Sequence, residues 1–232
     1  MQPDAYHGHG AQAPFFEGWY FKLVDAKRDE RIAIIPGICK TTEPADSHAF
    51  VQVFDGKSGE SGYSRVATHA FVAARDRFDV TVGTSHFSRE RIELAIDDDE
   101  LRLHGQLRLG PGPAWPRTPL RPGIMGHFAW IPFMECYHGL LSFDHSIDGE
   151  LELNGRRIDF TRGRGYIEKD WGSNFPATWV WCQCNHFERP GVSLSASIAL
   201  IPNLGRVFPG FIVGLRLGGV LFRFTTYARS LV

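Results

Sequence analysis

Short runs of alternating apolar and polar residues, separated by turn residues, are the feature that most constrains this chain. Ile92, Leu94 and Ile96 occupy alternate positions, Asp97-Asp98-Asp99 follows them, and residues 101–109 alternate again, which predicts a β-hairpin. Further hairpin-type turns are predicted at Asp55-Gly56, Asp148-Gly149, Asn154-Gly155 and Gly218-Gly219. No long stretch has the period of an amphipathic helix, so the pattern predicts an all-β protein of antiparallel strands, as in barrels and sandwiches.

Residues 111–123 interrupt this pattern. The run "GPGPAWPRTPLRPG" contains five prolines, which cannot donate hydrogen bonds to a sheet. We therefore predict an N-terminal β domain at 1–110, a Pro-rich linker at 111–123 and a C-terminal β domain at 124–232, with two β units meeting at the linker and no sheet continuing through it.

Composition excludes several classes of function. The 232 residues have a net charge of −1, which provides no field to attract nucleic acid or anionic lipid. No apolar run is long enough to cross a bilayer, and the N-terminus lacks a secretory signal, so a soluble cytoplasmic protein is expected. Cys39, Cys136, Cys182 and Cys184 show no zinc-ligand spacing and are interpreted as free thiols. There is no phosphate loop, G-x-S-x-G elbow or H-E-x-x-H motif.

The segment "GYIEKDWGSNFPATWVWCQCNHF", residues 165–187, concentrates acids and tryptophans. In an extended conformation Tyr166, Glu168 and Asp170 share one face. From Thr178 a second strand is expected, and the residues on one of its faces would be Trp179, Trp181, Gln183 and Asn185. Two indoles followed by two amides are typical of a ligand pocket. The alternative is that the tryptophans belong to a core and Glu-Lys-Asp to a solvated turn; the residue types leave both open.

Two other clusters allow two interpretations each. In "FFEGWYFKL", Glu17 and Trp19 share a face, and Glu17 is expected at a rim unless it is paired inside. In "FMECYHGLLSFDHS", His138 with a carboxylate could transfer protons, but Glu135 and His138 fall on opposite faces of a strand. An ordinary β-sheet histidine is therefore expected there, and His7 is expected in an N-terminal tail.

Four strings, "FFEGWYFKL", "IMGHFAWIPFMEC", "GRGYIEKDWGSNFP" and "WCQCNHF", together resemble the tocopherol cyclase-like family, in particular its bacterial members. The resemblance runs from about Phe15 to the C-terminus. More distantly, the third string is similar to the Tyr-x-Asp site of carotenoid 1,2-hydratases, with Glu168 where they carry Asp, and to lipocalin-like pericyclases.

The resemblance implies two tandem lipocalin-like antiparallel β-barrels around an apolar cavity. It also implies a longer protein, so the second barrel is expected to be incomplete at the C-terminus. Such a barrel would end at an open strand edge beside apolar residues, and self-association through that edge is expected.

The resemblance further implies an isomerase that closes a ring in a prenylated phenol or another hydrophobic alkene, without metal or nucleotide cofactor. The implied acid is Glu168, positioned by Tyr166 and Asp170. Cavity residues would be Trp179 and Trp181, with an orienting amide from Gln183 or Asn185, and Glu17 and Trp19 as further substrate-binding candidates. Two other functions stay open: an alkene hydratase, and a lipocalin-like carrier that binds an apolar small molecule without turnover.

Overall fold

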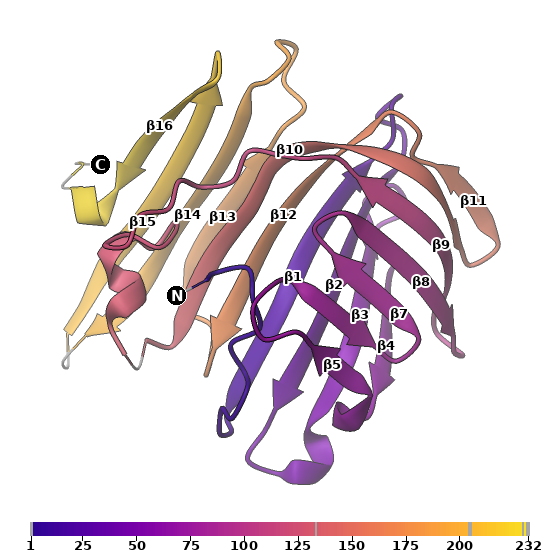
Figure 1. Cartoon of the computed structure of the whole chain (residues 1–232), viewed down its shortest axis with the longest axis horizontal. Helices are drawn as coiled ribbons and strands as arrows, with labels where there is room; N and C mark the ends of the chain where they lie inside the picture. The colour runs from indigo at the N-terminus through magenta and orange to yellow at the C-terminus, as the bar shows by residue number, and fades with distance from the viewer. Residues whose placement is uncertain (1, 133, 204–205, 229, 231–232) are drawn as a thin grey trace.

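The computed structural model describes residues 2–132, 134–203, 206–228 and 230. Within these residues the chain forms two antiparallel sheets and no α-helix, which confirms the all-β prediction (Figure 1). Four short 3₁₀ turns connect strands: η1 (Pro44–Asp46), η2 (Thr68–Ala70), η3 (Gly126–Trp130) and η4 (Thr226–Ala228).

The larger sheet has 12 strands among the described residues, and all but one of them follow the order β4-β3-β2-β1-β12-β10-β9-β8-β7-β6-β5, with β11 paired to β10. Its strands are β1 (Phe15–Val24), β2 (Arg31–Lys40), β3 (His48–Asp55), β4 (Ser61–Val66), β5 (Phe71–Ala73), β6 (Asp79–Val82), β7 (Ser85–Ser88), β8 (Arg91–Asp97), β9 (Arg102–Leu109), β10 (Cys136–Leu153), β11 (Arg156–Asp159) and β12 (Gly163–Gly172).

This sheet curls strongly but does not close through hydrogen bonds in the part of the chain that the structure describes. Its end strands β4 and β5 are consecutive in the chain and are joined by η2, so a 3₁₀ turn stands where a closed barrel would have a ladder. The inside of the curl is filled by one large apolar cluster that includes Trp19, Phe21 and Phe87. The main apolar core of the described residues therefore lies inside the larger sheet.

Most of the predicted hairpin turns are confirmed. Asn154 and Gly155 both have positive φ, as the tight turn between β10 and β11 requires. The turn predicted at Asp148-Gly149 is wrong, because these residues lie inside β10. Gly149 is needed there for close approach of β9: an added Cβ would lie 2.2 Å from the carbonyl oxygen of Gln106.

The expected separation at residues 111–123 is also wrong. The strands on either side of this segment, β9 and β10, are neighbours in one sheet. The prolines cannot donate, but their carbonyls accept, and the N–H of Phe143 on β10 donates to Pro113 O at 2.8 Å. The Pro-rich segment thus runs along β10, and the two sheets divide between β12 and the next strand, at residues 173–178.

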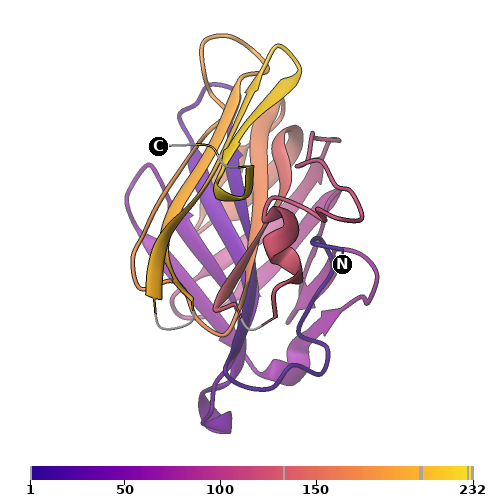
Figure 2. The same cartoon turned by 90° about the vertical axis from the view of Figure 1, so that its left-hand side faces the viewer.

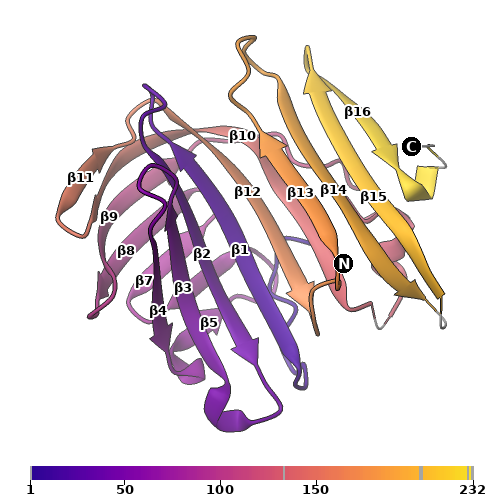
Figure 3. The same cartoon turned by 180° about the vertical axis from the view of Figure 1, so that it is seen from behind.

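The smaller sheet contains β13 (Trp179–Cys184), β14 (Ser193–Asn203), β15 (Arg206–Leu217) and β16 (Val220–Thr225), paired in that order. Figures 2 and 3 show it standing beside the curled sheet, next to β10 and β12. Within the described residues, β13 and β16 are its unpaired edges. It exposes large apolar side chains, among them Val180, Ile198, Val207, Phe222 and Phe224.

Two findings bear on the other composition-based predictions. All four cysteines are free thiols, as predicted. Among the described residues, no helix is long and apolar enough to cross a membrane.

Candidate active site

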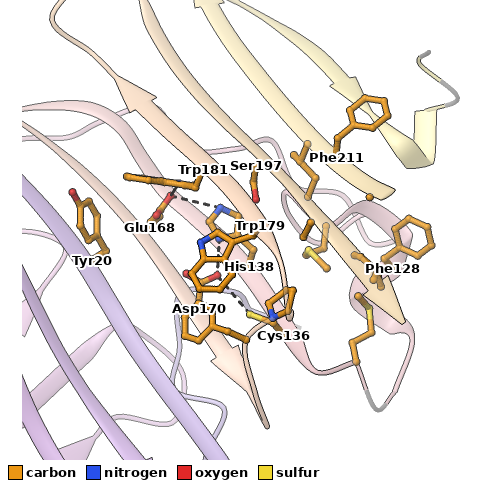
Figure 4. Close-up of a pocket in the computed structure, with 18 of the residues that line it drawn as sticks. Tyr20, Phe128, Cys136, His138, Glu168, Asp170, Trp179, Trp181, Ser197 and Phe211 are labelled. Carbon is orange, nitrogen blue, oxygen red and sulfur yellow. Dashed lines mark hydrogen bonds and ion pairs between the residues drawn. The ribbon is translucent and has the colours of Figure 1, made fainter. Parts of the chain in front are cut away.

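A pocket of about 410 Å³ lies between the two sheets (Figure 4). Most of its lining side chains are apolar or aromatic, and they come from β1, β2, β3, β10 and β12 on one side and from β13, β14 and β15 on the other. Residues near η3 and η4 complete the wall. A concave, largely apolar space with a few converging polar groups is the usual form of a small-molecule site.

Glu168 is the central polar group of this pocket and is 5% exposed. Its Oε2 atom lies 2.5 Å from the Tyr166 hydroxyl, and the Trp181 indole N–H donates to the same oxygen at 3.1 Å. Tyr166 is fully buried behind Glu168, and its hydroxyl also lies 3.0 Å from Ser195 Oγ. Glu168 therefore has a fixed orientation.

The neighbouring polar group is His138 on β10, which is paired with Asp170 across the sheet. The Nδ1 atom of His138 lies 2.8 Å from Asp170 Oδ1. Its other ring nitrogen, Nε2, lies 3.6 Å from Glu168 Oε2, which is too long for a hydrogen bond. Cys136 Sγ approaches Asp170 at 3.9 Å. Two carboxyl groups thus flank one imidazole.

The burial of these groups changes their pKa values. Burial raises the pKa of Glu168 to about 7, the charge of His138 opposes this shift, and the charge of Asp170 adds to it. Burial alone would lower the pKa of His138, but the charge and hydrogen bond of Asp170, with the charge of Glu168, raise it to about 9. Near neutral pH the site can therefore hold a protonated carboxyl beside an imidazolium.

Strand alternation explains which predicted residues meet here. β12 is paired on both sides, with β1 and β10, so its even-numbered residues 166, 168 and 170 face the smaller sheet. The facing strand β13 contributes Trp179 and Trp181, which line the same pocket as Glu168 and Asp170. The interpretation of Glu-Lys-Asp as a solvated turn is wrong, because Lys169 is fully buried and Glu168 nearly so.

Glu17 and Trp19 do not line the pocket. On β1 the side that faces it carries Phe16, Gly18 and Tyr20, while Glu17 and Trp19 are fully buried inside the curl of the larger sheet. Glu17 is thus paired inside, and the expected rim position is wrong. Both faces of β1 carry aromatic residues, so its sequence gives no signal for which side meets the ligand.

Gln183 and Asn185 are also outside the pocket lining. Asn185 is fully buried, and its Nδ2 donates to Asp144 Oδ1 at 3.1 Å and to Gly165 O at 3.0 Å, so it holds strands together. The predicted role of these amides in orienting a substrate is not supported by their position, because the pocket ends before it reaches them.

Two pocket residues were missed by sequence reasoning. Tyr20 lies on the face of β1 that was not chosen, and its pKa is raised to about 12 by burial and by the charge of Glu168. His138 was interpreted as an ordinary β-sheet histidine. Only the pairing of β10 with β12, which sets His138 opposite Asp170, shows its importance, and that pairing joins residues far apart in the sequence.

The arrangement can deliver a proton into an apolar space and accept one back, because a buried carboxyl group with a pKa near neutrality exchanges protons readily. Among the described residues, no group of three or more His, Cys, Asp or Glu side chains is arranged to hold a metal ion.

Comparison with solved structures shows the same fold at low sequence identity. A putative AttH from Nitrosomonas europaea superposes with a TM-score of 0.58 at 16% identity, over 96% of this chain and 74% of that one. CghA gives a TM-score of 0.57 at 10% identity, over 90% of this chain and 59% of CghA. Kievitone hydratase from Nectria haematococca gives 0.53 at 13% identity, over 96% of this chain and 69% of the hydratase.

Comparison with sequences is more specific. Tocopherol cyclase from Zea mays is 31% identical over 108 residues, which are 44% of this chain and 22% of the maize protein. A probable tocopherol cyclase from Oryza sativa subsp. japonica is 30% identical over 114 residues, 47% of this chain and 24% of the rice protein. Both are described as chloroplastic, and the match spans less than a quarter of each. A sequence model of the tocopherol cyclase-like family matches residues 95–231, which is more than half of the chain and includes Glu168, His138 and Asp170. This protein therefore belongs to the tocopherol cyclase-like family.

Proposed function

We propose that this protein is a cofactor-independent intramolecular cyclase, an isomerase, that protonates a carbon–carbon double bond of an apolar substrate with Glu168. The observation that carries the proposal is a buried carboxyl group, with its pKa raised to about 7, that lines an otherwise largely apolar pocket. A carrier needs only the apolar walls, whereas protonation of an alkene needs an acid held away from water.

The surroundings of Glu168 support this role. The hydrogen bonds from Tyr166 and Trp181 stabilise the carboxylate that remains after the proton has left. The aromatic faces of Trp179, Trp181 and Tyr20 lie along the same pocket, and each can stabilise a carbocation by about 0.5–2 kcal/mol, depending on desolvation. The walls carry acid and aromatic groups together, as the proposed reaction requires.

The proposed substrate is a prenylated phenol or another hydrophobic alkene that carries a hydroxyl group. The O–H bond of Glu168 breaks and a C–H bond forms, which leaves a carbocation. The hydroxyl oxygen of the substrate then bonds to the cationic carbon and its proton returns to Glu168, so the product has the mass of the substrate. The names of the plant cyclases support ring closure, and that of kievitone hydratase supports the related addition of water.

We place the protein in the cytoplasm, where free thiols such as its four cysteines persist, with its substrate drawn from a membrane surface. We also propose that it self-associates through β16, an unpaired edge among the described residues, where Phe222 and Phe224 are about half exposed. Light scattering should show concentration-dependent assembly that Phe222→Lys reduces. Leu120→Lys, which changes an exposed leucine in the Pro-rich segment, should leave it unchanged; a monodisperse wild-type monomer would contradict the proposal.

The test of the main proposal is incubation with a panel of prenylated hydroquinols, followed by mass spectrometry and NMR of the products. The expected product has unchanged mass, one double bond fewer and one free hydroxyl fewer. A product heavier by one water would favour the hydratase. Recovery of every compound unchanged, with tight binding, would favour the carrier.

A further inference from the structure

His138 occupies an unusual position for a buried histidine. Its Nδ1 is bound to Asp170 at 2.8 Å, while Nε2 is buried, has no hydrogen-bond partner among the described residues and lies 3.6 Å from Glu168 Oε2. Buried polar atoms are normally hydrogen-bonded, and the exceptions call for an explanation. Figure 4 shows the ring between the two carboxyl groups.

Among the described residues that line the pocket, no other side chain can supply a positive charge in place of His138. The described lining residues contain no lysine or arginine. The ionisable side chains that line the pocket beside His138 are Glu168 and Asp170 on β12, Cys136 on β10, Tyr20 on β1 and Tyr227 in η4. Tyr166 stands behind Glu168, and the lining residues of β2, β3, β13, β14 and β15 carry no ionisable side chain. Any positive charge facing Glu168 in the pocket therefore comes from His138.

We propose that His138, kept protonated by Asp170, is the counter-charge that stabilises the Glu168 carboxylate formed when Glu168 gives its proton to the substrate. This role rests on the proposed acid function of Glu168. His138 does not exchange atoms with the substrate in this scheme, so it is a positioning residue that acts through Glu168.

A count of charges shows what the trio achieves. Before the reaction, neutral Glu168, positive His138 and negative Asp170 sum to zero. After Glu168 has transferred its proton to the alkene carbon, the trio carries one negative charge and the substrate one positive charge. With a neutral residue at 138 the same step would take the pair of carboxyl groups from one negative charge to two, which a buried, largely apolar site strongly disfavours. When the hydroxyl proton of the substrate returns to Glu168, the initial state is restored.

The pH dependence of turnover separates this role from a structural one. Glu168 must be protonated to act, so wild-type turnover should be highest at low pH and fall as the pH rises through about 7. Because the imidazolium lowers the pKa of Glu168, His138→Gln should shift that fall to higher pH. The same variant should lower the low-pH plateau of kcat by about 10- to 100-fold, because Glu168 becomes a weaker acid.

Two further variants complete the set. His138→Lys restores a positive charge and should recover part of the plateau. His145→Gln is the matched control, because His145 is a buried histidine on the same strand that is bound to Ser142 and lies outside the pocket. It should leave both the plateau and the pH of the fall unchanged. A folded His138→Gln protein with a lower plateau but an unshifted fall would overturn the inference.

A measurement without substrate keeps this inference distinct from the proposed function. Imidazole NMR titration should place the His138 midpoint near pH 9 in the wild type, and well below that in Asp170→Asn, because burial then dominates. Infrared titration should show a carboxyl band that Glu168→Gln abolishes and whose disappearance His138→Gln moves to higher pH. Failure of the wild type to convert any probe would refute the cyclase alone. A neutral His138 at pH 7, or a Glu168 band unaffected by His138→Gln, would refute the counter-charge.

Discussion

The two faces of β12 carry buried charged groups in different surroundings. On the face toward the curl, Lys169 is fully buried with its Nζ 2.5 Å from Glu17 Oε1 and 3.1 Å from His7 Nδ1. The same ammonium lies 4.7 Å from the ring centre of Trp19 and 4.9 Å from that of Trp171. On the face toward the pocket, Glu168 accepts a hydrogen bond from Trp181 and lies 3.6 Å from Nε2 of His138. Both Glu168 and His138 line the pocket.

The two faces differ in whether their buried polar groups have hydrogen-bond partners. The Lys169 cluster includes the N-terminal segment, which was expected to be a tail: the N–H of His7 donates to Glu17 Oε2 at 2.8 Å, and the His7 ring stacks on Trp171 at 4.2 Å. Among the described residues, the buried polar side-chain atoms of this cluster all have hydrogen-bond partners, and its side chains lie outside the pocket that contains Glu168, so we interpret this face as structural. On the Glu168 face, Nε2 of His138 lies beside a cavity and has no partner in the part of the chain that the structure describes. Removing one partner of a satisfied buried ion pair is strongly destabilising, whereas an unpaired buried group beside a cavity is a candidate for function.

The largest expected effect breaks the complete face. Lys169→Met should leave the buried Glu17 carboxylate without its cation and lower the free energy of unfolding by about 3–5 kcal/mol. Urea denaturation would measure this. Lys27→Met, at an exposed position, is the control, and the double variant Glu17→Gln/Lys169→Met should recover much of the loss. If the Lys169→Met protein is stable but has lost turnover, the Lys169 face takes part in the chemistry and our assignment of the two faces is wrong.

A smaller effect is expected on the face of β12 toward the pocket, and it should appear in the turnover rate and not in the free energy of unfolding. Glu168→Gln keeps the shape of the side chain and removes the acid, so we expect normal folding and at least a ~100-fold loss of turnover. Steady-state kinetics with a substrate found in the hydroquinol panel, together with urea denaturation, would measure both. Glu152→Gln, an exposed glutamate on β10, is the matched control. Full activity of the Glu168→Gln protein would reassign the acid to Asp170.

The smallest expected effect sharpens the comparison within the pocket. Trp181→Phe keeps an aromatic face but removes the N–H that donates to Glu168 at 3.1 Å. Since that hydrogen bond lowers the pKa of Glu168, its loss should raise the pKa and reduce kcat by about 10-fold, equivalent to one hydrogen bond to a charged group. Trp130→Phe, at an exposed site outside the pocket lining, should have no such effect. An unchanged rate in Trp181→Phe would mean that the indole serves only as a wall.

The contrast also shows what the sequence could predict. Alternation placed Tyr166, Glu168 and Asp170 on one face, because that relation is local to a strand. It could not show which face of β1 meets the pocket, since both faces carry aromatic residues. Trp19 lies in the core, whereas Tyr20 lines the pocket. The partnership of His138 with Asp170 depends on the pairing of β10 with β12, which the sequence does not state. Gly149 had the composition of a turn but serves close strand packing, a tertiary effect that overrides local turn preference.

The position of β12 between β1 and β10 has a consequence for how such a protein can diverge. Substitutions at single positions change one face and leave the other intact. A gain or loss of one residue within Gly163–Gly172 would exchange the faces of everything beyond it, with Lys169 moved toward the pocket and Glu168 toward the apolar core. This strand can therefore tolerate substitutions but not a change in length. Natural insertions and deletions are expected to accumulate in the loops on either side of it.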